Sequence, residues 1–462
     1  MKQHFLGFSL LLLMFSFSAN AQSVTGVWQG ALKVAGTELP LVFHIKDSGD
    51  TLSATMDSPA QNALGIPVSA IAFDNPKLHL EAGNGAIVYE GTLSNDSIIG
   101  TFQQNGMNIP LNLHRGVVKE KAVIRPQQPK PPFPYKSEDL SFPNKKAGIT
   151  LAGTLTIPNE GSHFPTVILI SGSGPQDRDE SILSHKPFWV IADYLSRNGI
   201  AVLRFDDRGT AKSGGDFSTA TTADFATDVA AAVNYLKSRK DISPAKIGLI
   251  GHSEGGIIAP MVASKDKSIN FIVLLAGPGV DGAQLLLMQN EALGKAQGMS
   301  AEQLAEAKAV NEALYKIAVG NNNDSLAQQL ISEKLLALMP ADMPETQRQQ
   351  AVEAQSKMLT GPWMRYFLSN DPAKYLQQVY CPVLALEGTK DLQVPAEENI
   401  AAIKRALTEA GNKQVTTKIF PGLNHLFQDA QTGLPDEYGK IEETFSPKAL
   451  QFMTDWIKKQ VQ

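Results

Sequence analysis

The sequence lacks three features that would each indicate a particular class of protein. It has one cysteine, Cys381, among 462 residues, which excludes an intrachain disulfide, so stability must come from packing. Its 41 Lys and Arg are outnumbered by 46 Asp and Glu, which leaves no basic field for nucleic acid. It has neither a Gly-x-Gly-x-x-Gly after a predicted strand nor a P-loop, because GTAKSGG at 209–215 has the wrong spacing. We expect no nucleic-acid partner and no cofactor.

Long apolar runs are absent after the first residues. There, Lys2 precedes the apolar run FLGFSLLLLMFSF, and Ala19-Asn20-Ala21 provides the small-x-small pattern of a signal peptidase site. The run is shorter than the roughly 20 residues of a spanning helix, although a membrane anchor is the alternative. We interpret residues 1–21 as a removed signal peptide. The mature protein is then expected in the periplasm or secreted, without stable membrane insertion.

Short alternations of apolar and polar residues follow, as in GVWQGAL and LPLVFHI. They predict a small antiparallel β domain over residues 22–117. GTELPLVFH (36–44) and GMNIPLNLH (106–114) share a pattern, which we interpret as two similar hairpins, one opening and one closing a barrel or sandwich. His44 and His114 are explained by these matching strand ends, since zinc would require a third or fourth ligand. Residues 118–137 contain five prolines and predict a semi-rigid linker.

Strands and helices alternate over residues 138–462, the predicted catalytic domain. Several strands are apolar without alternation, as expected of a parallel sheet buried on both faces. Residues of about 280–380 have helical composition, which predicts a cap near the carboxyl ends of the strands. The fold class is α/β: an α/β-hydrolase fold with a mostly parallel eight-stranded sheet and a helical cap insertion, preceded by the antiparallel β domain. The expected strands are 138–143, 149–158, 165–172, 200–206, 246–251, 271–277, 381–388 and 414–422.

The stretch KIGLIGHSEGGIIAP (246–260) places Ser253 in a Gly-x-Ser-x-Gly pentad between a predicted strand and a predicted helix. A serine hydroxyl is a weak nucleophile unless a base lies within hydrogen-bond reach and the backbone turns sharply. Gly251 and Gly255 leave room for such a nucleophile elbow. The pentad therefore predicts that Ser253 is a nucleophile.

The base and the acid should follow the nucleophile in the order Ser, acid, His. Of eight histidines only His425 lies beyond Ser253, directly after the last predicted strand. Asp391 follows a buried strand in LEGTKDLQVP and should orient the imidazole without taking the proton. Three other aspartates are less well placed, because none directly follows a predicted sheet strand. They are Asp281, Asp371 and Asp429.

An oxyanion hole needs two backbone donors near the nucleophile. One should be the N–H of Glu254, and the other an N–H in SGSGPQDRDE after the strand at 165–172. Ser173 is the preferred candidate there, with Gly172 and Gly174 left open as alternatives. The elbow, acid, base and loop occur in order, each at a strand end, which is far more specific than the pentad alone.

These motifs resemble bacterial serine carboxylesterases of the α/β-hydrolase superfamily that join an N-terminal β domain to a capped catalytic domain, related to the S33 serine aminopeptidase-like group. The resemblance implies Ser253, Asp391 and His425 as the triad. One departure is Ala211 in RGTAKSGG, where such proteins usually have a second glycine. The matching stretches are GSGPQDRDE (172–180), RFDDRG (204–209), GHSEGG (251–256), PWMRYFLSNDP (362–372), GTKDLQVP (388–395) and PGLNHLF (421–427).

Other charged and aromatic residues have structural interpretations. Asp177-Arg178-Asp179 and Asp206-Asp207-Arg208 are expected to form a loop salt-bridge network that holds the oxyanion strand, with lining of the pocket as the alternative. Trp363, Tyr366 and Phe367, with Met364, are predicted to form an acyl-pocket wall, with ordinary cap packing as an equal alternative.

Three hypotheses follow for the function. The first is an exported serine esterase that acts through an acyl-enzyme on small or medium acyl esters, with a small-molecule ester as its partner. The second uses the same triad on a peptide or amide, as aminopeptidase-like relatives do. The third assigns binding of a glycan or partner protein to the β domain beside a vestigial hydrolase. The sequence specifies no oligomeric state.

Overall fold

The computed structural model describes residues 23–34, 37–47, 49, 51–59, 63–83, 87–104, 107–116, 125–339, 343 and 345–462. The predicted signal peptide lies outside these residues. Within them, no helix is both long and apolar enough to cross a membrane.

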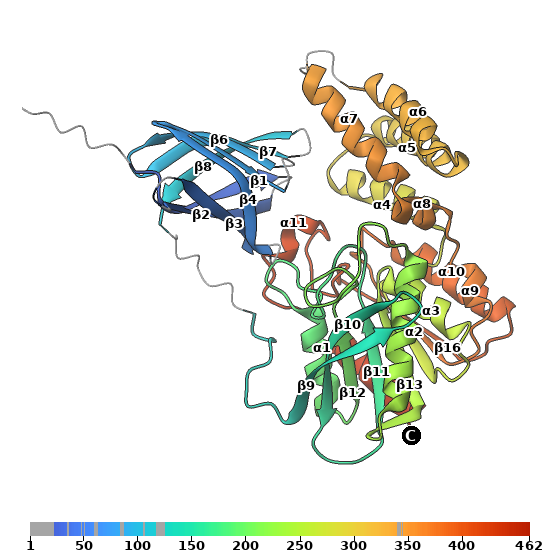
Figure 1. The fold of residues 1–462 in the computed structure, drawn as a ribbon. Helices are drawn as coiled ribbons and strands as arrows, with labels where there is room; N and C mark the ends of the chain where they lie inside the picture. The colour runs from blue at the N-terminus through green and yellow to red at the C-terminus, as the bar shows by residue number, and fades with distance from the viewer. Residues whose placement is uncertain are drawn as a thin grey trace, which may run out of the picture.

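The N-terminal part is a closed antiparallel barrel of eight strands (Figure 1). β1 pairs with both β2 and β8, which are the two strands that carry the repeated pattern. Trp28 fills the interior, and the guanidinium of Arg115 stacks on its ring at 4.3 Å from the centroid. The strands are β1 (Gly26–Val34), β2 (Thr37–Asp47), β3 (Leu52–Ser58), β4 (Ala63–Asp74), β5 (Lys77–Ala82), β6 (Ile87–Ser94), β7 (Ser97–Gln104) and β8 (Met107–Arg115).

Closure of the barrel is the feature that the sequence could not predict, so either a barrel or a sandwich was expected from it. Both architectures show the same alternation along each strand, and only the pairing of the first strand with the last distinguishes them. In the barrel that pairing joins Trp28 to Arg115 and Gln29 to His114. It leaves β1 and β8 without free edges.

The part of the linker that the structure describes is fastened to the catalytic domain. The guanidinium of Arg125 donates to the carbonyls of Leu183, Gly439 and Ile441 at 2.5–2.9 Å. Gln127 donates to the carbonyl of Phe445 at 2.7 Å. The prolines predicted an extended chain but not this attachment, while residues 117–124 lie outside the described ones.

The catalytic domain is built on an eight-stranded sheet in the order β16-β15-β14-β13-β11-β12-β10-β9. β9 and β10 are antiparallel to their neighbours, and the other strands run parallel. All eight coincide with expected strands. They are β9 (Tyr135–Asn144), β10 (Ile149–Pro158), β11 (Phe164–Ile170), β12 (Ala201–Phe205), β13 (Ile242–His252), β14 (Phe271–Leu275), β15 (Val383–Gly388) and β16 (Val415–Phe420).

Helices cover both faces of this sheet, as expected when a parallel sheet is apolar on both sides. One core forms under α1 (Pro187–Arg197) and α12 (Pro447–Gln460). The other lies under α2 (Thr222–Ser238), α3 (Gly255–Ala263) and α10 (Ala396–Glu409). The sequence analysis did not predict α12.

A helical insertion follows β14 and forms the cap (Figure 1). It has a core of its own, to which Leu314, Ile331 and Val352 contribute. α8 connects the cap to the sheet, because Leu368 belongs to the cap core and its neighbour Phe367 to the catalytic core. The cap helices are α4 (Gly282–Ala296), α5 (Ala301–Gly320), α6 (Asp324–Leu336), α7 (Glu345–Thr360), α8 (Pro362–Ser369) and α9 (Ala373–Leu376).

Candidate active site

Ser253 lies on a sharp turn between β13 and α3. Its φ is 51°, in the left-handed region that L-residues seldom adopt outside functional turns. The flanking glycines are required by close packing. A Cβ on Gly251 would lie 1.9 Å from the carbonyl oxygen of Gly255, and one on Gly255 would lie 2.2 Å from that of Ile170. The elbow expected from the pentad is therefore present in the structure.

His425 and Asp391 meet at the carboxyl ends of β15 and β16. The His425 Nδ1 lies 2.8 Å from the Asp391 Oδ2, and both residues are buried. The other carboxylate oxygen of Asp391 accepts the N–H groups of Gln393 and Val394, each at 2.8 Å. This arrangement places the ring proton on Nδ1 and leaves Nε2 free to act as a base.

His252 ties His425 to the elbow. Its Nε2 donates to the carbonyl oxygen of His425 at 2.9 Å, and the two ring centroids are 4.9 Å apart. Because His252 directly precedes Ser253, this contact brings the strand end that carries the base against the nucleophile. This role was not predicted from the sequence, where histidines were considered only as the base or as zinc ligands; the second position of GHSEG was the available signal.

Glu180 completes this arrangement. Its Oε1 lies 2.9 Å from the His252 Nδ1 and accepts the N–H of Gly172 at 2.8 Å. Burial alone would lower the pKa of His252, but the charge of Glu180 and hydrogen bonds to Glu180 and the His425 carbonyl raise it above its ordinary value. Both ring nitrogens of His252 face acceptors, which favours the imidazolium form.

Stability should depend on pH through this pair. A histidine whose pKa is raised on folding contributes stability that is fully present below its unfolded pKa of about 6.5 and is lost as pH rises through the folded pKa. Glu180→Gln should therefore lower the free energy of unfolding by about 1–3 kcal/mol at pH 6 and by less at pH 9. Urea unfolding at the two pH values measures this difference.

The matched control for that variant is Glu138→Gln. Glu138 pairs with Arg239 at 2.9 Å, and this pair contains no histidine, so its effect should be equal at both values. A Glu180→Gln loss that grew toward pH 9 would contradict the assignment.

The loop after β11 lies beside the nucleophile. A Cβ on Gly172 would be 3.1 Å from the Cβ of Ser253. The N–H of Gly172 is engaged by Glu180, which leaves Ser173 and Gly174 as candidate donors opposite the N–H of Glu254. The oxyanion roles of Ser173 and Glu254 stay predictions.

The three aromatic residues predicted to form a pocket wall lie in different surroundings. The Trp363 Nε1 donates to the carboxylate of Glu254 at 2.9 Å. Phe367 is buried and stacks on Trp363 with centroids 5.1 Å apart. The Tyr366 hydroxyl lies 3.2 Å from that of Tyr375. Trp363 is therefore the one that contacts the elbow, and substrate contact by the three stays a prediction.

Charged residues around the loop of the oxyanion hole form the predicted salt-bridge network. Arg178 binds Asp206 at 2.7 Å, and Arg204 pairs with Asp179. Asp207 accepts the Ser171 hydroxyl at 2.7 Å and the N–H of Gln176 at 3.0 Å, so it holds both ends of that loop. The structural interpretation of these charges is confirmed.

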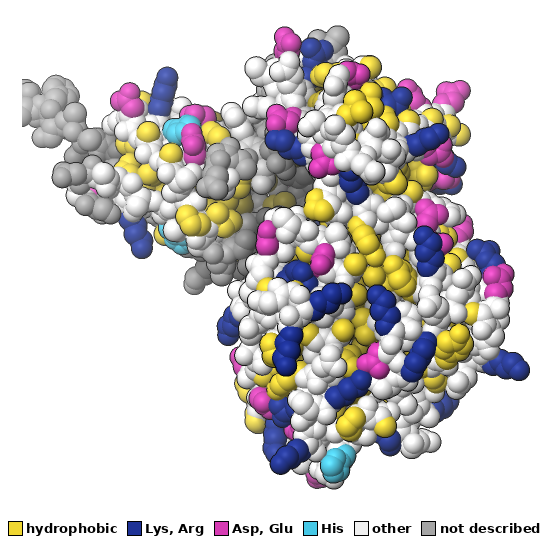
Figure 2. Space-filling model, turned by 45° about the vertical axis from the view of Figure 1, so that its right-hand side comes forward, with side chains coloured by type: hydrophobic (Ala, Val, Ile, Leu, Met, Phe, Trp, Pro, Cys, Tyr) yellow, Lys and Arg dark blue, Asp and Glu magenta, His cyan; other side chains and the backbone are white. Residues whose placement is uncertain are grey.

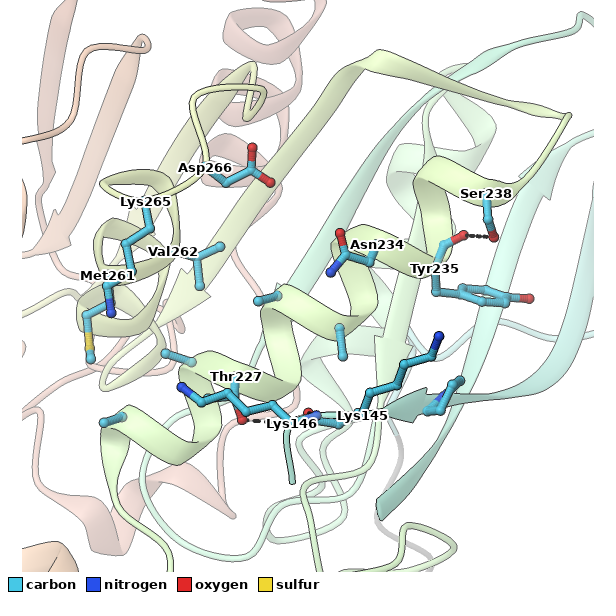
Figure 3. A pocket seen from close by; sticks show the side chains of 16 residues that line it. Lys145, Lys146, Thr227, Asn234, Tyr235, Ser238, Met261, Val262, Lys265 and Asp266 are labelled. Carbon is cyan, nitrogen blue, oxygen red and sulfur yellow. Dashed lines mark hydrogen bonds between the residues drawn. The ribbon is translucent and has the colours of Figure 1, made fainter. Parts of the chain in front are cut away.

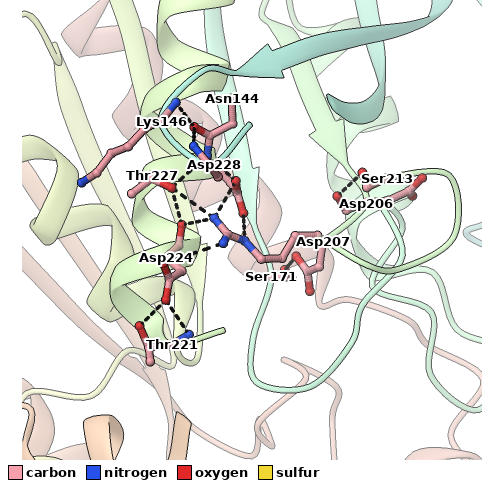
Figure 4. A network of polar contacts seen from close by, with 12 residues as sticks. Asn144, Lys146, Ser171, Asp206, Asp207, Ser213, Thr221, Asp224, Thr227 and Asp228 are labelled. Atoms are coloured by element: carbon pink, nitrogen blue, oxygen red, sulfur yellow. Dashed lines mark hydrogen bonds and ion pairs between the residues drawn. The ribbon is translucent and has the colours of Figure 1, made fainter. Parts of the chain in front are cut away.

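Arg208 anchors the following loop to α2 (Figure 4). Its guanidinium binds Asp228 at 2.7 and 2.9 Å and the Asp224 carbonyl at 2.6 Å. Ala211 lies in this loop with a φ of 47°, a conformation that favours glycine. This conformation is consistent with the glycine that the resemblance leads us to expect at that position.

A groove of about 790 Å³ lies away from the triad, on the outer side of α2 and α3 (Figure 3). Lys145, Lys146 and Lys265 are among its lining residues, and none of the triad residues is. On the face shown in Figure 2, apolar side chains form a band over the catalytic domain, and Lys and Arg side chains surround this band. The groove is therefore separate from the predicted triad.

His44 and His114, the two histidines of the repeated pattern, have separate partners. His44 lies 2.8 Å from Asp57, and His114 lies 3.0 Å from the Ser97 hydroxyl. No group of three or more His, Cys, Asp or Glu side chains within the described ranges could hold a metal ion.

The fold, the elbow at Ser253 and the paired Asp391 and His425 together define an α/β hydrolase. The chain belongs to the X-Pro dipeptidyl-peptidase (S15) family, which matches residues 147–422. The S33 part of the resemblance stays a prediction.

Similar proteins include esterase EstD of Thermotoga maritima, 28% identical over 65% of this chain and 64% of EstD. The chain thus spans less than two thirds of that relative. A protein named PA2218 from Pseudomonas aeruginosa is 28% identical over 29% of this chain and 35% of its own length. Among solved structures, the esterase Pf2001 of Pyrococcus furiosus is 17% identical over 70% of this chain and 91% of that one, with a TM-score of 0.42. That likeness is too distant to support an argument.

Proposed function

We propose that the protein is an exported serine carboxylesterase that cleaves esters of small or medium acyl groups through an acyl-enzyme. The observation that carries the proposal is the chain of contacts from Asp391 through His425 and His252 to the strained turn at Ser253. EstD, which is named an esterase, supports the choice of an ester.

In the first half of the reaction, the Ser253 Oγ attacks the ester carbonyl carbon and its proton passes to the Nε2 of His425. The N–H groups of Glu254 and Ser173 stabilise the oxyanion, and Asp391 stabilises the imidazolium. The carbon–oxygen ester bond then breaks, and the alcohol leaves with the proton from His425.

In the second half, water attacks the acyl group on Ser253 while His425 takes a proton from that water. The Ser253 Oγ leaves with the proton returned by His425, and the acid is released. Every proton is transferred through the same nitrogen, so the proposed chemistry uses only residues of this chain and water.

The second candidate function is hydrolysis of an amide by the same triad. It is favoured by the name of the matched family, which refers to a dipeptidyl-peptidase.

Parallel assays separate the two candidates. We expect kcat/KM on 4-nitrophenyl esters of short acids to exceed that on 4-nitroanilides of alanine and of Ala-Pro, each corrected with Ser253→Ala. Faster turnover of the Ala-Pro anilide would replace the esterase proposal with the peptidase one.

Location and the role of the barrel are part of the same proposal. Export follows from reading residues 1–21 as a signal peptide, which mass analysis of the mature N-terminus would test, with Gln22 as the expected first residue. Binding of a glycan or partner protein by the barrel stays a prediction.

A further inference from the structure

The carboxylate of Glu254 joins four parts of the site. Its side chain is buried, with the residue 2% exposed. It accepts the Thr222 hydroxyl from the start of α2 at 2.6 Å and the Trp363 Nε1 from cap helix α8 at 2.9 and 3.1 Å. The side chain of Ser173, from the loop after β11, also hydrogen bonds to it. The elbow, α2, the cap and the loop therefore meet at one carboxylate.

These donors account for a carboxylate in a place where burial is unfavourable. Burial raises the pKa of Glu254 above its ordinary value, and hydrogen bonds from Thr222, Trp363 and Ser173 offset part of that rise. An ionised acceptor makes stronger hydrogen bonds than a neutral one. Loss of one donor would leave the carboxylate partly unsatisfied and favour its displacement.

The same residue and its Ser173 partner are the expected oxyanion donors. Their N–H groups can act together only when the elbow and the loop lie at a fixed separation. A carboxylate that contacts both the Ser173 side chain and the cap tryptophan links that separation to the position of α8.

We propose that Glu254 is a positioning residue. It couples the position of cap helix α8, which it contacts through Trp363, to the geometry of the oxyanion hole, which it contacts through Ser173. The inference rests on the proposed function, since it assumes that Ser253 is the nucleophile. It assigns Trp363 a role beyond that of a pocket wall: its indole N–H holds the hole in its productive arrangement.

The rate of phosphorylation of Ser253 by a small dialkyl fluorophosphate tests this coupling without knowledge of the natural substrate. The Ser253 Oγ forms a bond to phosphorus, the phosphorus–fluorine bond breaks, fluoride leaves, and the Ser253 proton passes to His425. The phosphoryl oxygen occupies the oxyanion hole, so the maximal inactivation rate reports its geometry, while the half-saturating concentration reports binding of the probe.

Trp363→Phe removes the indole N–H and keeps a ring that can stack on Phe367. We expect it to lower the maximal inactivation rate about tenfold or more with little change in half-saturation. Glu254→Gln should have a similar effect, and the double variant should be no slower than the slower single variant, because both remove one link. Ser173→Ala, which retains the backbone N–H, should also slow inactivation.

The matched control is Trp456→Phe. It removes an indole hydrogen bond of 3.1 Å, to Thr416 on β16, outside the active site, and should leave the inactivation rate unchanged. Thermal unfolding verifies that each variant is folded. If Glu254→Gln fails to fold, Trp363→Phe alone tests the coupling.

Two results would overturn the coupling. One is a Trp363→Phe variant with a wild-type maximal rate and altered half-saturation, which is the behaviour of a pocket wall. The other is losses that multiply in the double variant, which would make the two residues independent. Absence of wild-type labelling at Ser253 would instead refute the proposed function, so the two failures are distinguishable.

Discussion

Replacing Asp391 by asparagine should lower kcat for ester hydrolysis by about four orders of magnitude, with a small change in KM. The carboxylate accepts the Nδ1 proton of His425 at 2.8 Å. An asparagine can present an N–H there, which would favour the tautomer with its proton on Nε2 and occupy the base. The fold should be retained, because the amide oxygen can still accept the N–H groups of Gln393 and Val394.

A neighbouring carboxyl group should not restore activity in that variant. Glu387 on β15 is fully buried, and burial, followed by the charge of Asp391, raises its pKa well above the ordinary value. A group kept neutral chiefly by burial cannot stabilise an imidazolium as a carboxylate does.

Asp281→Asn provides the matched control. Asp281 caps α4 by accepting the N–H of Gln284, and asparagine caps helices equally well. Steady-state kinetics on one aryl ester should show full activity for this variant. Equal losses in the two variants, or more than a tenth of wild-type activity in Asp391→Asn, would contradict the assignment of the acid.

Much of the fold of the catalytic domain was predictable because its physical requirements appear as patterns within short segments of the sequence. Strands buried on both faces need unbroken apolar runs, as in FIVLL of β14, and all eight expected strands lie in one sheet. The elbow needs glycines on both sides of Ser253. The acid and base need only to follow strand ends, and that position places Asp391 and His425 together.

The remainder could not be predicted because it depends on contacts between distant segments. His252 and Glu180 meet across 72 positions, and Trp363 and Glu254 across 109. No periodicity in the sequence indicates that two such distant residues are in contact. The closure of the barrel and the fastening of Arg125 to the carbonyls of Gly439 and Ile441 are of the same kind. α12 was missed although its burial pattern is amphipathic.

Replacing Ser253 by alanine should abolish esterase activity, with kcat lowered by about six orders of magnitude. Alanine removes the hydroxyl that would form the acyl-enzyme and leaves His425 without a proton to accept. Stability should not fall. The backbone strain at a φ of 51° is relieved only slightly, because alanine has a Cβ just as serine does. A variant that loses activity but keeps the wild-type unfolding temperature would show that the loss comes from the missing hydroxyl and not from unfolding.

The most direct test of the account is labelling of the purified protein with a fluorophosphonate, wild type beside Ser253→Ala, with the adduct located by peptide mass. We predict one adduct, on the peptide that contains Ser253, and none in the variant. Absence of labelling in a folded wild type, or an adduct that persists in Ser253→Ala, would contradict the assignment of Ser253 as an activated nucleophile.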